Sequence, residues 1–577
     1  MRKDLFSALA RRIFIGVCVA IVACSSTTSP TVTTNVGRCS SSVVSVAVLT
    51  SVTVACDSST TLTLDAGGAS YLVVPQFATD TGSIAQVGYT ISASGGVIAS
   101  PSPIASPFTT ASFARTSQSM TPASSDPGLM QRTFDAAMTN RARQVRTSAR
   151  REQNPSRAMT LTAVPAVGST RQFQVVSSTT FNRYTTVTAQ LVYVGNAVLL
   201  YIDTQAPSNG FSSSQLQGFG QLFDQTLYPI DTAAFGSPSD IDANGHLIML
   251  MTPVVNALTP SSTCAQNGYI GGFFNSADLV NTANSNNGEI FYSIVPDPNG
   301  TVSCQHTVNQ LLLNEPPVFL HELQHLINFS QHFVLHGGQP EMGWLDEGLS
   351  IVAEELGSIY YELKFPPPSG RTDPSQLFPD SSQGFINGLL VDSYRYLLRT
   401  DTTTVTLHSD SDLGLNWRGG DWLLLRWLGD QKGASFYRSL EQSTNTGGVN
   451  IAHAAGESFQ SLFGDFSLAL YTDSLPGVAR ASVPARNRFL SRNLRRLYQR
   501  LFDTSSPQDA PRPFPILTTS LTGSISASMV PGTMSFYRLN TAGGASTVTI
   551  QLTSPNGTAI SSQLHPQISV FRLPSGV

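Results

Sequence analysis

Charged side chains are scarce in this chain. Asp, Glu, Lys and Arg make up 12% of its 577 residues, where soluble proteins average about a quarter. The formal net charge is −4, so there is no basic excess of the kind that binds nucleic acid, and we expect no nucleic-acid partner. The chain also lacks any G-x-S-x-G stretch, which excludes the nucleophile elbow of a serine hydrolase.

The hydrophobic run near the N-terminus is too short to cross a membrane. Ile13–Ala23 follows four basic residues and has about half of the roughly twenty residues that a bilayer requires. We therefore expect a secretory signal over residues 1–24. Ile21-Val22-Ala23-Cys24 resembles a bacterial lipoprotein box, and residues 25–35 form a Ser/Thr-rich tether. This predicts export and lipid attachment through Cys24 to the cell envelope, with an ordinary cleaved signal and secretion as the alternative.

Cysteines are few, and no C-x-x-C pair indicates a zinc ribbon or a redox site. Two of the six cysteines fall in the signal region. In an exported protein the other four most simply form two disulfides between neighbours in the sequence. The predicted bonds are Cys39–Cys56 and Cys264–Cys304.

The length and the shifts in composition predict a multidomain α+β protein. Period-2 alternation with turn residues predicts a β-sandwich-like module at residues 36–116 and another at 514–577. Between them, strands followed by helices predict an α+β domain at residues 171–475. Residues 476–513 read as a basic helix and linker, and we expect the helix to dock on the domain before it.

Residues 117–170 differ from their surroundings, with seven arginines between Arg132 and Arg157 and almost no acids. One interpretation is a solvated helix with a linker. The other is a removable pro-segment with basic cleavage sites. The sequence leaves both open.

Strands of the central domain are expected at Arg171–Val176, Thr185–Val194 and Ala197–Ile202, with a two-residue Gly195-Asn196 turn joining the last two. A later run, Glu289–Val295, is expected as an edge strand. An extended peptide could add to such an edge by main-chain pairing.

Asp240, Asp242 and Asn244, followed by Gly245, copy the opening of a calcium-binding loop. The position of the bidentate Glu in an EF-hand is taken by Met251. A turn rich in Asp and Asn is the alternative to a Ca²⁺ site.

The most specific motif is His321-Glu322-Leu323-Gln324-His325, an H-E-x-x-H element in an apolar run of helical period. The i, i+4 spacing places both imidazoles on one helix face, where they can bind one zinc ion. Glu322 is then positioned to take a proton from a water that the metal activates. The motif predicts a zinc-dependent hydrolase with Glu322 as its general base.

A catalytic zinc site needs a third protein ligand and an open fourth position. The metzincin pattern requires Gly at 328 and His at 331, but the chain has Asn328 and Gln331. The gluzincin pattern takes a Glu from the next helix, and Glu347 fits. Glu354 lies two turns later on the same helix. It is either the third zinc ligand in place of Glu347 or a side chain that hydrogen-bonds to a zinc ligand, and Asp346 is another candidate for this second role.

These segments resemble the hyicolysin-type gluzincin metallopeptidases over roughly residues 171–471. FLHELQHLINF (Phe319–Phe329) and WLDEGLSIVAEEL (Trp344–Leu356) are the specific carriers of the resemblance. Three further runs support it: FGSPSDIDANGHLIML (Phe235–Leu250), GGDWLLLRWLGDQ (Gly419–Gln431) and SFQSLFGDFSLALY (Ser458–Tyr471). The resemblance implies a zincin-like catalytic domain in which His321, His325 and Glu347 bind zinc and Glu322 is the general acid and base.

One departure from the family concerns the group that stabilises the oxyanion of the transition state. Relatives commonly have Tyr-Gly before the later helix, where this chain has Trp417-Arg418-Gly419. A cation or hydroxyl can fill that role. Arg418, Tyr394 and Tyr396 remain alternatives.

The sequence as a whole predicts an exported zinc metallopeptidase, an endopeptidase of gluzincin type acting on extracellular or periplasmic proteins. Its expected partners are a protein or peptide substrate and, through a lipid anchor, the membrane. A surface adhesion or glycan-binding lipoprotein with an inactive zincin-like domain is the rival interpretation. The intact H-E-x-x-H motif weighs against that rival.

Overall fold

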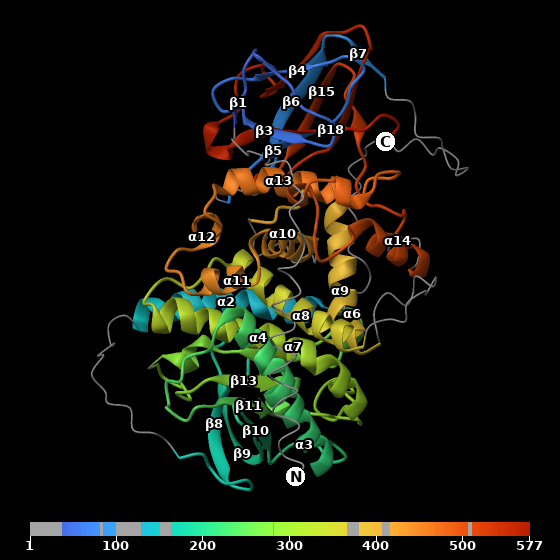
Figure 1. The fold of residues 1–577 in the computed structure, drawn as a ribbon. Helices are drawn as coiled ribbons and strands as arrows, with labels where there is room; N and C mark the ends of the chain where they lie inside the picture. Colours follow the sequence, from blue (N-terminus) through green and yellow to red (C-terminus); the bar gives the residue numbers. More distant parts are fainter. Residues whose placement is uncertain are drawn as a thin grey trace, which may run out of the picture. The chain divides into compact units, whose positions relative to one another are not determined.

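The computed structural model describes residues 37–80, 85–99, 128–149, 163–280, 282–365, 380–406, 416–505 and 510–577. The fold is α+β, with three sheets and many helices (Figure 1). The predicted signal, Cys24 and the tether lie outside the described residues, so lipid attachment stays a prediction. Within the described ranges, no helix combines the length and the apolar character that a membrane crossing needs.

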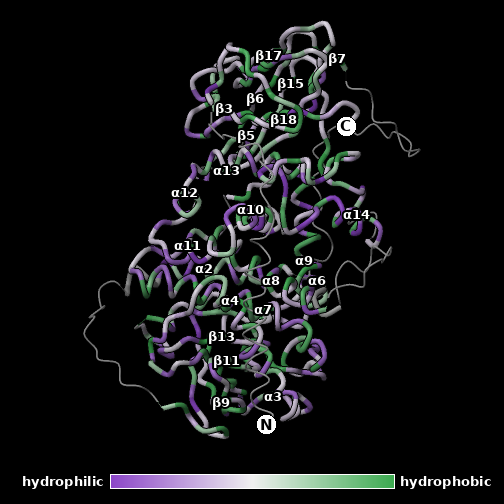
Figure 2. Tube along the Cα trace, in the orientation of Figure 1, coloured by the Kyte–Doolittle hydropathy of each residue, from purple (hydrophilic) through white to green (hydrophobic). Residues whose placement is uncertain are grey.

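The central domain contains a six-stranded sheet with the strand order β12-β13-β11-β10-β9-β8. Its strands are β8 (Thr170–Val176), β9 (Tyr184–Val194), β10 (Val198–Asp203), β11 (Leu247–Met251), β12 (Gly272–Phe274) and β13 (Ile290–Ser293). The β9–β10 hairpin turns at Gly195, as predicted. The fully buried β11, LIMLM, is hydrophobic along its whole length (Figure 2), as expected for a strand covered on both faces.

The edge of this sheet differs from the prediction. Glu289–Val295 was expected at an edge, but β13 lies inside the sheet, paired with β11 on one side and β12 on the other. The edge strand is β12, a three-residue Gly-Phe-Phe run. It is too short to show an alternating pattern, so no strand could be predicted there.

Helices cover the sheet and continue beyond it. They are α2 (Leu129–Ala149), α3 (Ser213–Leu222), α4 (Tyr228–Phe235), α5 (Pro253–Asn256), α6 (Cys264–Asn267), α7 (Val308–Phe329), α8 (Gly343–Lys364), α9 (Asp380–Leu397), α10 (Asn416–Lys432), α11 (Ser435–Glu441), α12 (Gly447–Ala455), α13 (Phe459–Thr472) and α14 (Leu494–Thr504). Short π-helical and 3-10 turns follow or connect helices at Phe223–Leu227, Ser330–Leu335, Arg480–Ser482 and Ala485–Asn487, and others lie between strands at Ser276–Leu279 and Ser562–Leu564.

Helix α7, which carries the H-E-x-x-H motif, begins earlier than its prolines suggest. Thr307 caps it, and the side chains of Thr307 and Gln310 form a reciprocal capping box. Pro316 and Pro317 therefore lie inside the helix rather than in its first turn. Phe319 fixes α7 on the sheet, with its ring 5.5 Å from that of Phe291.

Two glycines let α8 approach its neighbours closely. A Cβ on Gly348 would lie 2.7 Å from Leu425 of α10, and one on Gly357 would lie 2.6 Å from Leu320 of α7. Neither glycine has a positive φ, so the requirement is space rather than backbone freedom. The Gly in Trp-Leu-Asp-Glu-Gly thus sets the distance between α8 and α10.

The two predicted β-modules are one sandwich, which corrects the expected division into residues 36–116 and 514–577. Strand β5 (Ser70–Phe77) lies between β18 (Pro566–Leu573) and β16 (Tyr537–Thr541), and β6 (Val87–Ser94) lies between β15 (Ser524–Met529) and β17 (Thr547–Thr553). The remaining strands are β1 (Gly37–Arg38), β2 (Val43–Val44), β3 (Ser51–Ala55), β4 (Thr61–Asp65), β7 (Val97–Ile98) and β14 (Thr519–Ser520). Buried residues from both ends of the chain fill its interior.

The expected basic helix is shorter than predicted and docks on the helical layer. Arg492, just before α14, contacts Glu355 and Glu362 of α8, each at 2.7 Å. Arg486 pairs with Asp465 of α13 at 2.8 Å. These buried and half-buried ion pairs attach the segment to α8 and α13.

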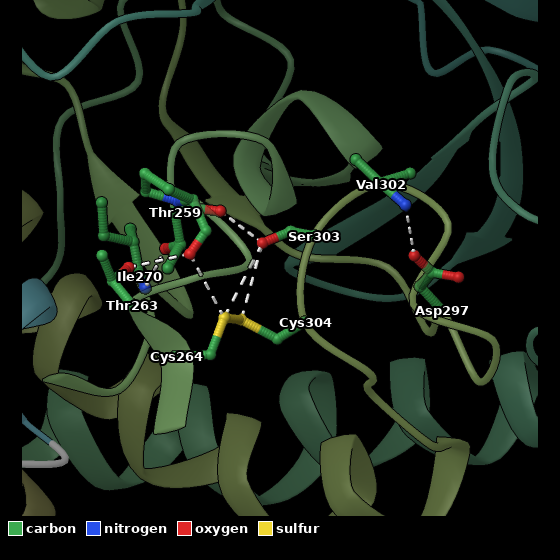
Figure 3. The surroundings of a disulfide bond; sticks show 9 residues. Thr259, Thr263, Cys264, Ile270, Asp297, Val302, Ser303 and Cys304 are labelled. Atoms are coloured by element: carbon green, nitrogen blue, oxygen red, sulfur yellow. Dashed lines mark hydrogen bonds between the residues drawn. A yellow bond between two sulfur atoms is a disulfide. The ribbon is translucent and has the colours of Figure 1, made fainter. Parts of the chain in front are cut away.

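Both disulfides join the cysteines that the sequence pairs, Cys39 to Cys56 and Cys264 to Cys304, with Cα atoms 5.0 and 6.0 Å apart. The second connects α6, just before the edge strand, to the loop that leads into α7 (Figure 3). Ser303 reaches the Thr259 carbonyl beside this bond. The disulfide therefore links the segment that precedes β12 covalently to the segment that precedes α7.

The shared sandwich predicts a long-range effect of truncation. A chain ending at Pro513 leaves β5 and β6 without any of their neighbours, so we expect residues 51–94 to lose their amide protection in hydrogen-exchange mass spectrometry. Deleting the tether, residues 25–35, serves as the control and should leave that protection intact. Persistent protection of residues 51–94 in the truncated chain would mean that the N-terminal strands fold alone.

Candidate metal centre

Helix α7 presents two imidazoles to one point. The Nε2 atoms of His321 and His325 lie 3.1 Å apart, and the two residues are 4% and 9% exposed. Their spacing of one helical turn stacks them on the same face, as predicted. Two buried rings with converging nitrogens form one side of a metal site.

Helix α8 supplies the third group. The Glu347 oxygens lie 3.6 Å from His321 Nε2 and 3.7 Å from His325 Nε2. Ligands bonded to zinc at about 2.0–2.1 Å in a tetrahedron stand about 3.3 Å apart, close to all three separations. Glu347 is 4% exposed, and neither of its oxygens has a hydrogen-bond partner among the described residues. A buried carboxylate in this state fits a metal ligand.

The other nitrogen of each imidazole is held by an acidic side chain. His321 Nδ1 lies 2.9 Å from Glu354 Oε1. His325 Nδ1 lies 3.0 Å from Asp346 Oδ1 and 3.1 Å from Ser350 Oγ. Carboxylates placed in this way orient imidazoles that bind metals. Glu354 and Asp346 therefore contact the imidazoles, and Glu347 is the carboxylate that faces the converging nitrogens.

Glu322 points from α7 toward the edge strand. Its Oε2 accepts a hydrogen bond from the Phe274 amide at the end of β12, at 3.0 Å. Burial, and then the nearby Asp135 carboxylate, raise the pKa of Glu322 well above its usual range. The side chain stands beside the three candidate ligands without joining them.

Of the three residues considered for the oxyanion, only Arg418 reaches the site. Its guanidinium lies 3.3 Å from Glu347 Oε2 and 3.4 Å from His321 Nε2. Tyr394 donates instead to the Arg512 carbonyl at 2.7 Å, and burial next to Asp421 raises the pKa of Tyr396. Neither tyrosine lines the cavities around His321 and Glu322.

Sequence reasoning missed Asp135, which helix α2 brings to the site. Carboxylate and imidazole atoms of Asp135, His321 and Glu322 lie within 4.8 Å of one another. Burial and the Glu347 carboxylate raise the pKa of Asp135 to about 7. Its position in an Arg-rich segment far upstream gave no signal, since only the fold brings the two regions together. The packing of α2 also excludes the interpretation of this segment as a solvated helix.

The charges around the two imidazoles are mostly negative. Burial opposes protonation of His325, but the Asp346 and Glu347 carboxylates outweigh it and raise its pKa to about 10. Burial and the Arg418 and His325 charges have the opposite effect on His321, whose pKa is well below its ordinary value. One guanidinium faces several carboxylates here. A divalent cation would balance them.

The predicted calcium site differs from the structure in one residue: Glu289 joins Asp240 and Asp242, and Asn244 does not. Oxygens of Asp240, Asp242 and Glu289 lie within 4.8 Å of one another. Glu289 is 2% exposed, and its Oε2 has no hydrogen-bond partner among the described residues. Asn244, expected as a ligand, instead donates to Asp242 at 2.8 Å while its oxygen accepts from the His246 amide.

Comparison with known proteins gives one informative likeness. No protein-family model matches the chain. It is 27% identical over 199 residues to the neutral metalloprotease ShpI of Staphylococcus hyicus, a match that covers 33% of this chain and 42% of that protein. Less than half of the relative is therefore represented. The likeness agrees with the coarser part of the expected resemblance, to metallopeptidases.

The geometry predicts different effects for the two competing carboxylates. Glu347→Gln removes a donor that faces the metal, so we expect zinc affinity to fall by more than about 100-fold. Glu354→Gln only loosens the orientation of the His321 ring, so we expect zinc affinity to fall about 10-fold. Competition with a chelating zinc indicator measures both, with thermal melts as the control for folding. A larger loss in Glu354→Gln would make Glu354 the ligand.

Proposed function

We propose that this protein is a zinc metallopeptidase with a zincin-like catalytic domain of gluzincin type, in which His321, His325 and Glu347 hold the ion. The observation that carries the proposal is the convergence, at zinc-ligand spacing, of two imidazole nitrogens and a buried carboxylate whose oxygens have no hydrogen-bond partner among the described residues. The likeness to a metalloprotease supports the same activity.

In this proposal the protein residues transfer the proton and orient the zinc ligands. Bound zinc would polarise the scissile carbonyl and acidify water. Glu322, held by the Phe274 amide, takes the proton of the attacking water and delivers it to the departing amine. Glu354 and Asp346 hold the Nδ1 sides of the imidazoles, which leaves both Nε2 lone pairs directed at the ion.

The substrate in this proposal is an extended polypeptide that pairs with the edge strand β12. This strand ends at Phe274, whose amide contacts Glu322. A peptide aligned along the strand would therefore pass the general base with its carbonyl groups near the ion. We propose endopeptidase action, in which the substrate chain continues on both sides of the scissile bond. The signal-like N-terminus favours action on proteins outside the cytoplasm, from an envelope site anchored at Cys24.

Glu322→Gln separates catalysis from metal binding. The amide cannot accept the proton, so we expect cleavage of casein to fall by at least about a thousandfold, while the zinc content of the purified protein stays near that of the wild type. Casein zymography and elemental analysis measure the two quantities. Equal cleavage by the variant would rule out Glu322 as the general base and reopen the binding-protein interpretation.

We also propose a Ca²⁺ site at Asp240, Asp242 and Glu289. Three carboxylates, one of them buried with an unpartnered oxygen, are hard oxygen donors of the kind that calcium prefers. The site lies at the start of β11 and β13, so a bound ion would link the two strands.

Calcium should raise the melting temperature of the zinc-loaded protein by several degrees, since it binds only the folded state. Glu289→Gln should abolish that shift while zinc affinity stays unchanged. Differential scanning calorimetry in calcium-free buffer, with and without added Ca²⁺, measures the effect. An identical melting temperature in both buffers would leave this cluster as a turn without an ion.

A further inference from the structure

Helix α2 is part of the core although its sequence is rich in arginine. Phe134 is 2% exposed, and its ring lies 5.2 Å from that of Phe273 in the edge strand. Met138 is also buried. In Figure 1 the helix (cyan) lies next to α8. This position puts α2 between the edge strand and the start of α8.

A side chain of α2 occupies the main-chain groups of the edge strand. The Gly271 amide donates to Gln131 Oε1 at 2.8 Å, and Gln131 Nε2 donates to the Gly272 carbonyl at 2.9 Å. One amide group thus satisfies a backbone donor just before β12 and a backbone acceptor within it. The Gly272 carbonyl belongs to the strand that we assign to the substrate, so α2 and a paired polypeptide would compete for it.

One turn further along α2, Asp135 reaches the reacting groups. It is 5% exposed, and its Oδ2 has no hydrogen-bond partner among the described residues. That oxygen lies 4.0 Å from the Arg418 guanidinium, and Asp135 clusters with His321 and Glu322. Its Oδ1 accepts a hydrogen bond from Gln131 Nε2 at 2.6 Å. A buried carboxylate held in this way, with its second oxygen beside the candidate ligands, is placed to take the open fourth position of a zinc ion.

Two cavities lie at this point, and α2 lines both. The first is lined by Met138, Thr139, Phe274, His325 and Glu341, and the second by Gln131, Pro317, His321, Glu354 and Arg418. Asp135 and Glu322 line both. Side chains of α2 therefore border the space beside the candidate ligands, where the scissile bond of a substrate would lie.

We propose that α2 is an internal inhibitor of the peptidase, which fills the polypeptide-binding cleft and directs Asp135 at the position that water and substrate must share. The inference rests on the proposed function, because it assigns the occupant of that same cleft. A polypeptide substrate and α2 exclude each other. Activity then requires displacement of α2 or cleavage of the chain beside it.

The sequence offers sites for such cleavage. Arginines continue through and beyond the helix, at Arg141, Arg143, Arg146, Arg150, Arg151 and Arg157. The contacts of Arg143 are to the Glu341 carbonyl and the Met342 sulfur, and water can replace them. A protease that cuts after basic residues would divide the chain between α2 and β8.

Charge also links α2 to the metal. Without a cation, Asp135 lies close to the like charges of Glu322 and Glu347, with Arg418 as the nearby positive group. A divalent ion attracts the Asp135 carboxylate and so strengthens the docking of the helix. By reciprocity, docking of the helix strengthens metal binding. The inhibitor should thus raise zinc affinity while it lowers activity, a combination that simple structural support does not produce.

The test uses the full-length, zinc-loaded protein and three single substitutions. Asp135→Ala removes the carboxylate, Gln131→Ala removes the contact with the edge strand, and Thr133→Ala changes an exposed α2 side chain that bonds only within the helix. We expect kcat/KM for a quenched-fluorescent peptide to rise at least tenfold in the first two and to stay unchanged in the third. Zinc affinity should fall about tenfold in Asp135→Ala. It should fall less in Gln131→Ala, which removes the 2.6 Å hydrogen bond to Asp135 Oδ1, and stay unchanged in Thr133→Ala.

A second measurement is independent of activity. Hydrogen exchange of residues 129–144 is followed in the zinc-loaded wild type with and without a saturating dipeptide hydroxamate, which binds zinc in the cleft. We expect exchange in α2 to become at least tenfold faster when the hydroxamate binds, while exchange in β11 stays the same. This readout decides the question even if Asp135→Ala fails to fold.

The possible outcomes distinguish a failure of the inhibitor proposal from a failure of the proposed peptidase function. If the peptide is cleaved, Asp135→Ala is no faster than Thr133→Ala and the hydroxamate leaves α2 protected, then α2 is a fixed part of the enzyme and the inference is overturned. If no variant cleaves any peptide but the hydroxamate still releases α2, the proposed hydrolysis fails while occupation of the cleft by α2 stands.

Discussion

A buried cluster of imidazoles and carboxylates between α7 and α8 is the constraint on which the rest of the structure depends. Buried charges are stable only when they are paired, and the Glu347 oxygens have no hydrogen-bond partner among the described residues. Helices α7 and α8 can approach closely because Gly357 leaves space for Leu320 of α7, and Gly348 in the same way admits Leu425 of α10. The convergence of the imidazoles and carboxylates therefore depends on the packing of these helices.

The parts of this site that lie close in the sequence could be predicted from it. The H-E-x-x-H spacing fixes the relation of His321 to His325 within one helix, and Glu347 follows on the next helix. Glu354 could not be separated from Glu347 by spacing, because both lie on the same face of α8. Only the distances show that Glu354 meets His321 Nδ1 and that Glu347 faces the converging nitrogens.

What the sequence could not predict are the pairings between distant segments. Alternation shows which face of a strand is buried but not which strand lies beside it. The sequence therefore predicts two separate β-modules, whereas in the structure β5 and β6 each pair with C-terminal strands and form one sandwich. The same limit hid Asp135, whose helix joins a site formed almost two hundred residues later. In both cases, segments that are remote in the sequence complete one unit of the fold.

The central claim is that one zinc ion lies between α7 and α8, and anomalous diffraction above and below the zinc absorption edge tests it most directly. Crystals of the purified protein, grown without chelators, should show a single strong anomalous peak about 2.0–2.2 Å from His321 Nε2, His325 Nε2 and a Glu347 oxygen. No peak at this position in zinc-replete crystals, or a peak held by other residues, would contradict the account.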